Sequence, residues 1–301
     1  MVESSGSDRS LAFVLGTGRC GSTLIQEIVA RHPSVGFLSN LEDRFPLPPS
    51  LGRWNGAIYR STPQWFSRKG RIRFAPSEGY RALARQVSPV LVAPPRDLVA
   101  EDAAPWMAAS LRRFFGDRAD AQGTPLFLHK FTGWPRAGLL HAVDPGARFV
   151  HIVRDGRAVA NSFLQMSWWR GFEGPEAWGW GPLPDPYEHE WVASKGSFAV
   201  LAGIQWKMLI DAFDEARSKI SPKAWLELRY EDVVAEPRQR IGEILTFLGL
   251  DWSDRFEEGF RRYTFRTERT EAYRTDLGSA DVEALDRILA SHLERLGYVA
   301  E

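Results

Sequence analysis

The sequence predicts an α/β fold in which a central parallel sheet is flanked by helices. Short apolar runs alternate with segments of helical periodicity, which is typical of a parallel sheet covered on both faces. A glycine-rich turn joins the first apolar run to the first helical segment. The chain has 301 residues, of which 44% are hydrophobic, enough to bury a sizeable core in one elaborated domain.

The expected strands are short and apolar, and they lie at residues 11–15, 35–39, 126–130, 148–153 and 224–229. The expected helices lie at 22–31, 135–143, 155–165, 197–219, 237–248 and 280–296. Pro33 ends the first helix, because the residue before a proline is pushed out of the α region. In the helix at 237–248, Ile241, Ile244 and Leu248 share one face, and Gly249 provides the C-terminal stop.

Two irregular stretches interrupt this alternation. Residues 44–125 begin with a proline- and glycine-punctuated tract and are expected to form a cap or loop insertion with a helix or two. Residues 166–196 form a second insertion, rich in tryptophan and glycine. We expect residues 1–10 to be a disordered leader and 11–301 to be a single domain in which both insertions shape a binding site.

Composition excludes several classes of function. The 38 basic and 38 acidic residues cancel, which argues against nucleic-acid or membrane-surface binding. No apolar stretch approaches the 18 residues of a membrane span, and the single cysteine, Cys20, fits a reducing compartment. No His/Cys/Asp cluster has metal-ligand spacing. These features predict a soluble, cytoplasmic protein without a metal, and they leave the oligomeric state open.

The segment from Gly16 to Leu24 (GTGRCGSTL) is the sharpest local signal. Glycines let successive backbone N–H groups face one anion, and the following helix adds the positive end of its dipole. Ser22 and Thr23 add hydroxyl groups, and Arg19 adds a fixed charge suited to phosphate or sulfate. Three interpretations stay open: a dinucleotide fingerprint with Glu42 downstream, a Walker loop that lacks its lysine, and a cradle for one 5′-phosphate.

A second motif distinguishes these interpretations. Arg154 follows the strand at 148–153, and Ser162 lies two turns into the next helix. Ligands of open α/β sheets bind at the carboxyl ends of strands, so Arg154 is placed to meet whatever the glycine loop holds. A nucleotide with phosphates at two separate positions needs both sites, whereas a dinucleotide fold does not need the second.

Four motifs together resemble the family of sulfotransferases that use 3′-phosphoadenosine 5′-phosphosulfate (PAPS). Residues 19–24 (RCGSTL) are similar to the family's 5′-phosphosulfate loop, and 154–162 (RDGRAVANS) to its 3′-phosphate motif. Residues 228–237 with 247–250 resemble its strand–helix unit, whose tyrosine, Tyr230 here, contacts the adenine. Residues 296–298 (LGY) are similar to the bacterial and tyrosylprotein branches.

The resemblance implies a PAPS-dependent sulfotransferase of P-loop-like fold that releases 3′-phosphoadenosine 5′-phosphate (PAP) and requires no metal. The nucleotide would be held by residues of the three motifs, namely Arg19, Cys20, Gly21, Ser22, Thr23, Leu24, Arg154, Ser162 and Tyr230. Lys130 lies where the family carries a catalytic lysine, and Arg19 and Lys130 would stabilise charge during transfer.

The sequence identifies the catalytic base less directly than it identifies the nucleotide-binding residues. The family's small-molecule enzymes have a histidine two residues after the lysine, where this chain has Thr132. The tyrosylprotein and glycan branches use a glutamate, and the similar region here points to Glu42, with Asp43 as its neighbour. His129 lies next to Lys130, but strand alternation points it to the opposite face, as a core histidine.

Several residues carry open alternatives. Cys20 fills a tight loop or acts as a nucleophile, and packing is favoured. Arg157 is a 3′-phosphate ligand or a helix charge, and Arg266, Arg269 and Arg274 lie where the family folds a basic loop over the nucleotide. Six tryptophans between Trp168 and Trp206 form an acceptor-binding wall or pack the insertion, with Trp206 expected in the core. The acceptor is a small molecule, glycan or natural product, and the rival functions are an ATP-dependent kinase and a non-catalytic dinucleotide-binding module.

Overall fold

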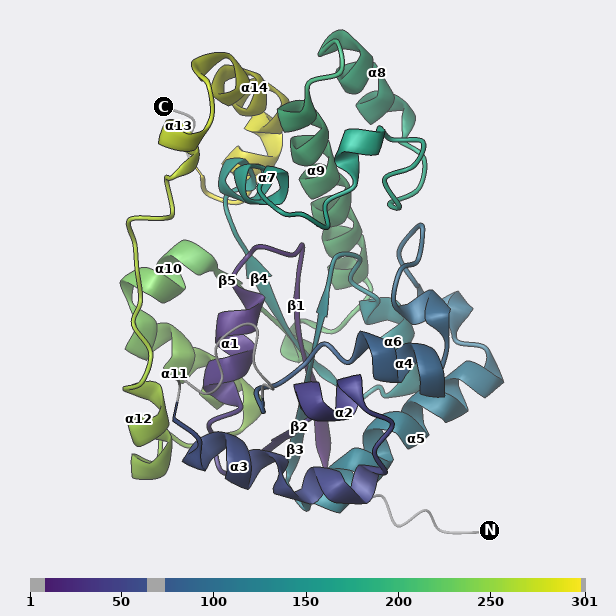
Figure 1. The fold of residues 1–301 in the computed structure, drawn as a ribbon, viewed down its shortest axis with the longest axis vertical. Coiled ribbons are helices and arrows are strands. Elements are labelled where there is room, and N and C mark those ends of the chain that lie inside the picture. Colours follow the sequence, from purple (N-terminus) through teal and green to yellow (C-terminus); the bar gives the residue numbers. More distant parts are fainter. Residues whose placement is uncertain (1–8, 64–73, 299–301) are drawn as a thin grey trace.

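A computed structural model describes residues 9–63 and 74–298. Its core is a five-stranded sheet in the order β2-β3-β1-β4-β5, and every pairing is parallel. The strands are β1 (Ser10–Gly16), β2 (Val35–Phe37), β3 (Leu126–Thr132), β4 (Arg148–Val153) and β5 (Trp225–Arg229). The predicted α/β class with a parallel sheet flanked by helices is confirmed (Figure 1).

Strand alternation divides the side chains between two apolar layers. Phe13, Phe131 and Phe149 lie in one layer, where Phe13 stacks against both other rings. Val14 and Leu128 lie in the other. The period of two explains why neighbouring residues of one strand serve different layers.

The face that carries Val14 and Leu128 is covered mainly by α1 (Ser22–Val29), α11 (Pro237–Leu248) and α12 (Asp254–Phe260). Helix α11 buries Ile241, Ile244 and Leu248 as the sequence predicts, and it ends at Gly249 with a φ of 73°. A left-handed residue at this place is readily supplied by glycine, which has no Cβ to clash.

The opposite face is covered by α5 (Pro105–Gln122) and α6 (Ala137–Val143), with α4 (Tyr80–Gln86) beside them. Helix α5 differs from the sequence expectation, because it lies inside the 44–125 insertion yet forms part of the main core. Its 18 residues bury Leu111 and Phe115 against the sheet layer of Phe13. This half of the insertion is therefore a structural layer as well as a cap.

Besides α4 and α5, the described part of that insertion contains short elements, and α2 (Asn40–Arg44) leads into it. The short elements are η1 (Pro49–Trp54), α3 (Asn55–Ser61), η3 (Pro89–Leu91) and η4 (Ala100–Asp102). An isolated antiparallel bridge between Ser39 and Pro76 ties the segment before α4 to the end of β2. This bridge places residues 77–80 near the carboxyl edge of the sheet.

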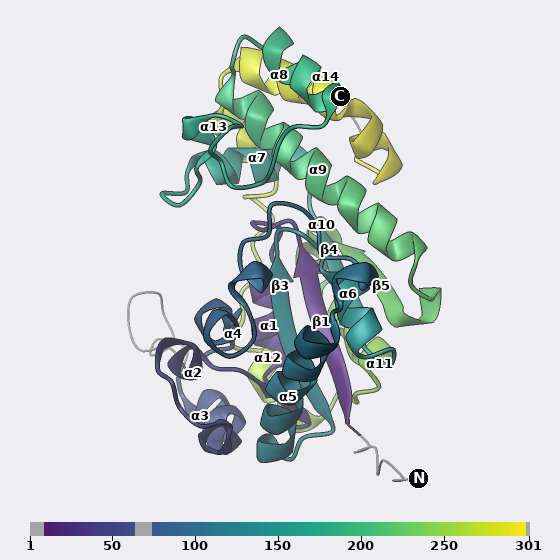
Figure 2. The same cartoon turned by 90° about the vertical axis from the view of Figure 1, so that its right-hand side faces the viewer.

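A second group of helices lies beyond the carboxyl ends of the strands (Figures 1 and 2). It contains α7 (Gly156–Leu164), α8 (Asp185–Ala193), α13 (Tyr273–Asp276) and α14 (Ser279–Arg295), together with η5 (Gly171–Glu173). Helix α9 (Phe198–Ser218) runs from this group back beside α6, and η6 (Pro222–Ala224) leads from it into β5. The carboxyl edge of the sheet thus faces a helical cover.

Ser10, which the sequence placed in the leader, is part of a strand. Ser10 belongs to β1, where it pairs with Leu126 and donates its N–H to Pro125 O at 2.9 Å, while residues 1–8 lie outside the described residues. Helix α10 (Tyr230–Ala235) follows β5 directly. Within residues 9–63 and 74–298, no helix is long and apolar enough to cross a membrane.

Candidate functional site

The glycine loop joins β1 to α1 through three residues with positive φ. Gly18 has a φ of 85°, Arg19 of 57° and Gly21 of 91°. A Cβ on Gly21 would lie 2.2 Å from Cδ2 of Tyr230, so glycine is required there by both backbone and neighbour. The loop curls over the sheet edge, and α1 starts at Ser22 with its first N–H groups at that edge.

Cys20 lies inside this loop and is fully buried. A Cβ added to Gly16 would lie 2.3 Å from the Cys20 sulfur, which shows how closely the thiol fills the turn. The structure therefore favours packing over the nucleophile hypothesis. Ser22 is buried as well, and the Leu24 side chain packs against the apolar layer of α1 while its N–H bonds to Gly21 O.

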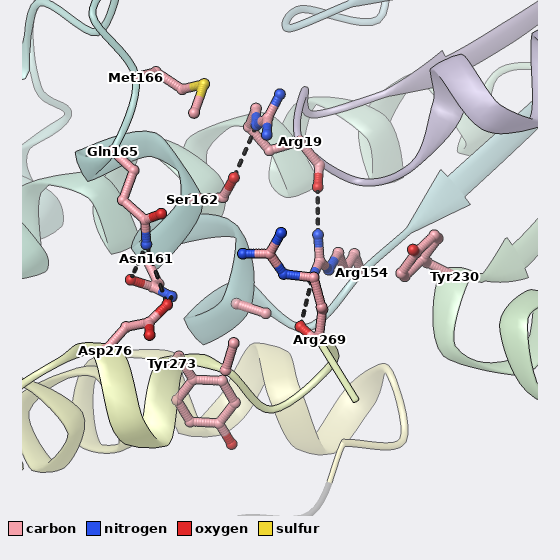
Figure 3. A pocket seen from close by; sticks show the side chains of 12 residues that line it. Arg19, Arg154, Asn161, Ser162, Gln165, Met166, Tyr230, Arg269, Tyr273 and Asp276 are labelled. Atoms are coloured by element: carbon pink, nitrogen blue, oxygen red, sulfur yellow. Dashed lines mark hydrogen bonds between the residues drawn. The ribbon is translucent and has the colours of Figure 1, made fainter. Parts of the chain in front are cut away.

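Arg19 joins the two sequence motifs. Its Nε donates to Ser162 Oγ at 2.8 Å, although the two residues are 143 positions apart in the chain (Figure 3). Burial and the nearby Arg154 guanidinium lower the pKa of Arg19. Two guanidinium groups held this close in a half-buried place are stabilised by an anion between them.

Arg154 extends the same cluster. Its Nη1 donates to Arg19 O at 2.9 Å and its Nη2 to Arg269 O at 3.1 Å. Its guanidinium carbon lies 4.9 Å from the centre of the Tyr230 ring. Figure 3 shows Arg154 between the glycine loop and the segment that carries Arg269, with Tyr230 to one side. The two motifs and the predicted adenine residue therefore meet.

These side chains surround a cavity of about 310 Å³. Its walls include Arg19, Arg154, Asn161, Ser162, Tyr230 and Arg269. Of the three C-terminal arginines, Arg269 lines the cavity, whereas Arg274 lies on α13 next to Glu271. Tyr273 forms part of the same wall, and burial raises its pKa to about 12. Sequence reasoning had named the segment but no ligand within it.

The guanidinium of Arg157 is paired with carboxylates of the protein itself. Its Nη2 lies 2.7 Å from Asp155 Oδ2 and its Nη1 2.7 Å from Asp286 Oδ1, and the side chain is almost fully buried. These carboxylates raise the pKa of Arg157, so the charge is held within the protein. The structure thus favours a helix-anchoring role over phosphate binding.

The ammonium group of Lys130 lies between the hydroxyl of Thr23 in the glycine loop and the carboxylate of Glu78. Its Nζ donates to Thr23 Oγ1 at 2.6 Å and lies 2.8 Å from Glu78 Oε1. Thr132 Oγ1 donates to the same carboxylate oxygen at 3.0 Å. Lys130 is 4% exposed, whereas the Glu78 side chain is 29% exposed. The carboxylate beside the predicted catalytic lysine is therefore one that sequence reasoning missed.

Glu42 occupies a different environment from the one expected of a base. It closes a capping box at the start of α2, where Ser39 N donates to its Oε2 at 3.2 Å. Asn55 donates to the same oxygen, and Arg118 Nε lies 3.6 Å from Oε1. The side chain is 3% exposed. Its oxygens face these structural partners, which favours a structural role for Glu42, and its role as the base stays a prediction.

Asp43 does not replace it. Its Oδ1 accepts the N–H of Ala82 at 2.9 Å, and its backbone oxygen accepts a bond from Arg85 at 2.8 Å. The carboxylate thus holds the first turn of α4 against α2. A shift of one residue in the sequence match would therefore not supply a base.

His129 is a core residue, as strand alternation predicts. It is 1% exposed, and the rings of Phe115 and Phe131 lie 5.1 and 4.8 Å from its own. Burial among these rings lowers its pKa to about 3. The imidazole stays neutral at physiological pH and lies on the face away from Lys130.

The tryptophans of the second insertion divide into two groups. Trp206 is fully buried in α9, as expected for a core residue, and Trp191 packs against the apolar cluster that also contains Trp134, Trp178 and Trp180. Trp168, Trp169, Trp178 and Trp180 share the walls of a second cavity of about 230 Å³ with Trp134 and Thr132, among others. Thr132 therefore contacts Glu78 and also faces this cavity.

The polar groups at the sheet edge form two sets. Arg19, Arg154 and Ser162 are joined by hydrogen bonds and line one cavity, while Thr23 and Lys130 are joined by a separate hydrogen bond. Within residues 9–63 and 74–298, no group of three or more His, Cys, Asp or Glu residues is arranged to hold a metal ion.

A sequence-family comparison matches residues 12–254 to the sulfotransferase family, so the chain belongs to that family. A comparison with curated proteins gave no match.

Solved structures that are similar include sulfotransferase STF9 from Mycobacterium avium, with a TM-score of 0.61, 16% identity and coverage of 98% of this chain and 79% of that one. The sulfotransferase domain from the curacin biosynthetic pathway has a TM-score of 0.55 and 14% identity, and it covers 97% of this chain and 99% of that one. The domain from the Synechococcus PCC 7002 olefin synthase has a TM-score of 0.53 and 18% identity, with 97% and 96% covered. At these identities the structures establish the fold.

Proposed function

We propose that the protein transfers a sulfuryl group from PAPS to the hydroxyl group of an acceptor and releases PAP. The observation that carries this proposal is the meeting of three elements at one sheet edge. The glycine loop contacts the Arg154–Ser162 motif through Arg19, and it contacts the Lys130–Glu78 pair through Thr23. One elongated ligand with a phosphate at one end and a reacting group at the other fits this arrangement.

In this proposal the first end of the site holds the 3′-phosphate. Arg154 and Ser162 supply a guanidinium and a hydroxyl, and Arg269 lines the same cavity. Tyr230, whose ring lies against Gly21 and below Arg154, offers a flat surface for the adenine. A charge-assisted contact to a phosphate would offset the burial and the repulsion from Arg154 that together lower the pKa of Arg19.

The second end of the site holds the 5′-phosphosulfate. The glycine loop and the first N–H groups of α1 face this end, together with the Thr23 hydroxyl and the Lys130 ammonium. When bound, PAPS supplies an activated sulfuryl group on a phosphate oxygen. Lys130 is placed to stabilise the negative charge that develops on that oxygen as the bond to sulfur breaks.

Glu78 is the base in this mechanism. Its carboxylate takes the proton of the acceptor hydroxyl while the acceptor oxygen forms a bond to sulfur. The sulfur–oxygen bond to the nucleotide breaks in line, and the electron pair leaves with PAP. Three observations support Glu78 over Glu42: its contact with Lys130, its contact with Thr132 and its partial exposure.

The rival functions meet specific obstacles. A Walker loop needs a lysine for the terminal phosphates, and this loop has Ser22 and Thr23 instead. A dinucleotide fold needs an acidic residue free to bind the ribose, whereas Glu42 is buried in its capping box. The carboxylate base also agrees with the bacterial and tyrosylprotein branch, which stays a prediction here.

The proposal is tested by titrating the purified protein with PAP, using 5′-AMP, ATP and NAD as comparators. We expect PAP to bind much more tightly than 5′-AMP, because the 3′-phosphate meets Arg154 and Ser162. A sulfuryl-transfer assay with radiolabelled PAPS then measures turnover. Equal affinity for PAP and 5′-AMP, or a preference for ATP or NAD, would contradict the proposal.

A further inference from the structure

The aromatic cavity beside Thr132 has the composition of a binding site for a flat, weakly polar molecule. Five tryptophans line its walls, four of them from the second insertion and one, Trp134, from the segment after β3. Trp134 and Trp180 face each other with ring centres 6.1 Å apart. Trp168 is 54% exposed at the cavity, although it is a large apolar side chain. An exposed tryptophan in a concave wall marks a surface that a ligand can cover.

Most polar groups in these walls are already bonded within the protein. Trp169 Nε1 donates to Gln205 at 2.8 Å, and Trp178 Nε1 donates to Gly181 O at 2.7 Å. Arg170 Nε donates to Glu173 at 2.9 Å. These side chains therefore offer ring surface and few free hydrogen-bonding groups to a ligand.

Arg136 belongs to the same set. Its Nε donates to Leu91 O at 2.9 Å and its Nη2 to Val92 O at 3.2 Å, and its Nη1 bonds to Trp134 O. The side chain is 2% exposed. The guanidinium thus holds the cavity wall together and has no free face for an anionic ligand.

One polar donor in the wall has no partner in the described part of the chain. Trp134 is 7% exposed, and its indole N–H makes no hydrogen bond to residues 9–63 or 74–298. That nitrogen is enclosed within the wall, so the cavity presents the Trp134 ring and not its N–H to a bound molecule. The cavity therefore offers mainly aromatic surface, and the Thr132 hydroxyl in its wall is already bonded to Glu78 and Tyr80.

We propose that this cavity binds the acceptor and that the acceptor is a hydroxyl-bearing aromatic compound of one or two rings rather than a sugar. This inference rests on the proposed function. A sugar presents a hydroxyl on nearly every carbon and would leave many of them unpaired between these walls. At about 230 Å³ the cavity is smaller than the ~300–1,000 Å³ of most drug-sized sites, which suits a small ring system.

Thr132 connects the cavity to the reacting groups. Its side chain faces the cavity, and its Oγ1 lies 3.0 Å from Glu78 Oε1, which in turn lies 2.8 Å from Lys130 Nζ. A ring stacked on the tryptophans with its hydroxyl directed past Thr132 reaches the base. In the transfer step the phenolic proton goes to Glu78, the phenolic oxygen bonds to sulfur, and PAP leaves with the electron pair of the broken bond.

Equilibrium dialysis in the presence of saturating PAP tests the inference directly. The probes are 2-naphthol and N-acetylglucosamine, and the proteins are the wild type, W168A, W180A and W106A. Trp106 is the matched control, because it is 56% exposed on α5 and does not line the cavity. We expect 2-naphthol to bind the wild type, with affinity about fivefold or more lower in W168A and W180A and unchanged in W106A.

The outcomes separate this inference from the proposed function. Tighter binding of N-acetylglucosamine than of 2-naphthol, or 2-naphthol binding that W168A leaves unchanged, would overturn the aromatic-acceptor proposal. If PAP does not bind the protein in the same dialysis experiment, the proposed function is overturned. Binding of 2-naphthol that depends on the tryptophans would still support the aromatic site in that case. If W180A fails to fold, W168A carries the test, since Trp168 is exposed and its removal leaves little space in the core.

Discussion

Lys130 Nζ lies 2.8 Å from Glu78 Oε1, although the whole of helix α5 lies between the two residues in the chain. The lysine also donates to Thr23 in the glycine loop at 2.6 Å. One side chain therefore touches both the loop that is proposed to hold the donor and the carboxylate that is proposed to activate the acceptor. This relationship determines which substitutions separate binding from chemistry.

The first prediction concerns the base. E78Q keeps the shape of the side chain but removes its ability to take a proton, so kcat should fall about 10²–10⁴-fold. Affinity for PAP should change little, because the carboxylate does not lie at the 3′-phosphate end. Turnover measured with radiolabelled PAPS and PAP affinity measured by calorimetry check the two parts. A variant with wild-type kcat would remove Glu78 from the mechanism.

The second prediction concerns the lysine. K130A removes the cation that is proposed to stabilise charge on the leaving oxygen, and loss of one such group typically lowers kcat about 10²–10³-fold. The variant should still bind PAP, since Arg154 and Ser162 are untouched. K130R offers a comparison that keeps the charge but changes its position. Unchanged turnover in K130A would contradict the assignment.

The third prediction concerns recognition of the 3′-phosphate. R154A should weaken PAP binding by about 10- to 100-fold, because a charge-assisted contact contributes about 1.5–3 kcal/mol. Binding of 5′-AMP should change far less, which makes it the internal control. S162A should also weaken PAP binding more than 5′-AMP binding, but by a smaller factor than R154A. If R154A weakens both nucleotides equally, its contact with Arg19 O would mean that it acts by holding the loop.

The parts of the site that were predicted from the sequence depend on local structure. Loop and helix are contiguous in Gly16–Leu24, so glycine spacing alone predicts where the proposed 5′-phosphosulfate end lies. The parallel register pairs Val14 with Lys130, which brings a strand-end lysine beside the loop whatever the insertions do. Alternation along β3 then separates His129 from Lys130 correctly.

The proposed base, Glu78, was not predicted from the sequence, because its position depends on contacts between distant segments. Glu78 reaches Lys130 only after the Ser39–Pro76 bridge ties its segment to the end of β2. The proline-rich sequence around Pro76 has no helical or strand periodicity from which this bridge could be predicted. Helix α5 was missed for a related reason, since the buried Arg118 interrupts its apolar pattern and is stabilised by Phe114 O and Gln86.

The fourth prediction separates Glu42 from Glu78. Glu42 is a buried partner of Arg118, so E42Q leaves that guanidinium without its carboxylate and should lower the free energy of unfolding by about 2–4 kcal/mol. Its kcat should stay near that of the wild type under conditions where the protein is folded. E78Q should instead have a low kcat even under conditions where the protein is folded, whatever stability it loses through its contact with Lys130. Urea denaturation and turnover assays on both variants test this, and a stable but inactive E42Q would restore Glu42 as the base.

The fifth prediction concerns acid stability. Burial lowers the pKa of His129 from 6.5 to about 3, so the unfolded chain binds a proton on this residue below pH 6.5 while the folded chain does not. Stability from the neutral imidazole is therefore present above pH 6.5 and is lost as the pH falls toward 3. Each pH unit in this window costs about 1.4 kcal/mol, or about 2.7 kcal/mol by pH 4.5. H129L removes the titrating group, so the variant should not lose this stability on acidification. The free energy of unfolding of H129L minus that of the wild type should therefore be about 2.7 kcal/mol higher at pH 4.5 than at pH 7. Urea denaturation at both pH values measures the change. H189Q, which alters an exposed histidine, should leave the difference unchanged, and an equal pH response in H129L and the wild type would show that His129 takes up its proton without unfolding.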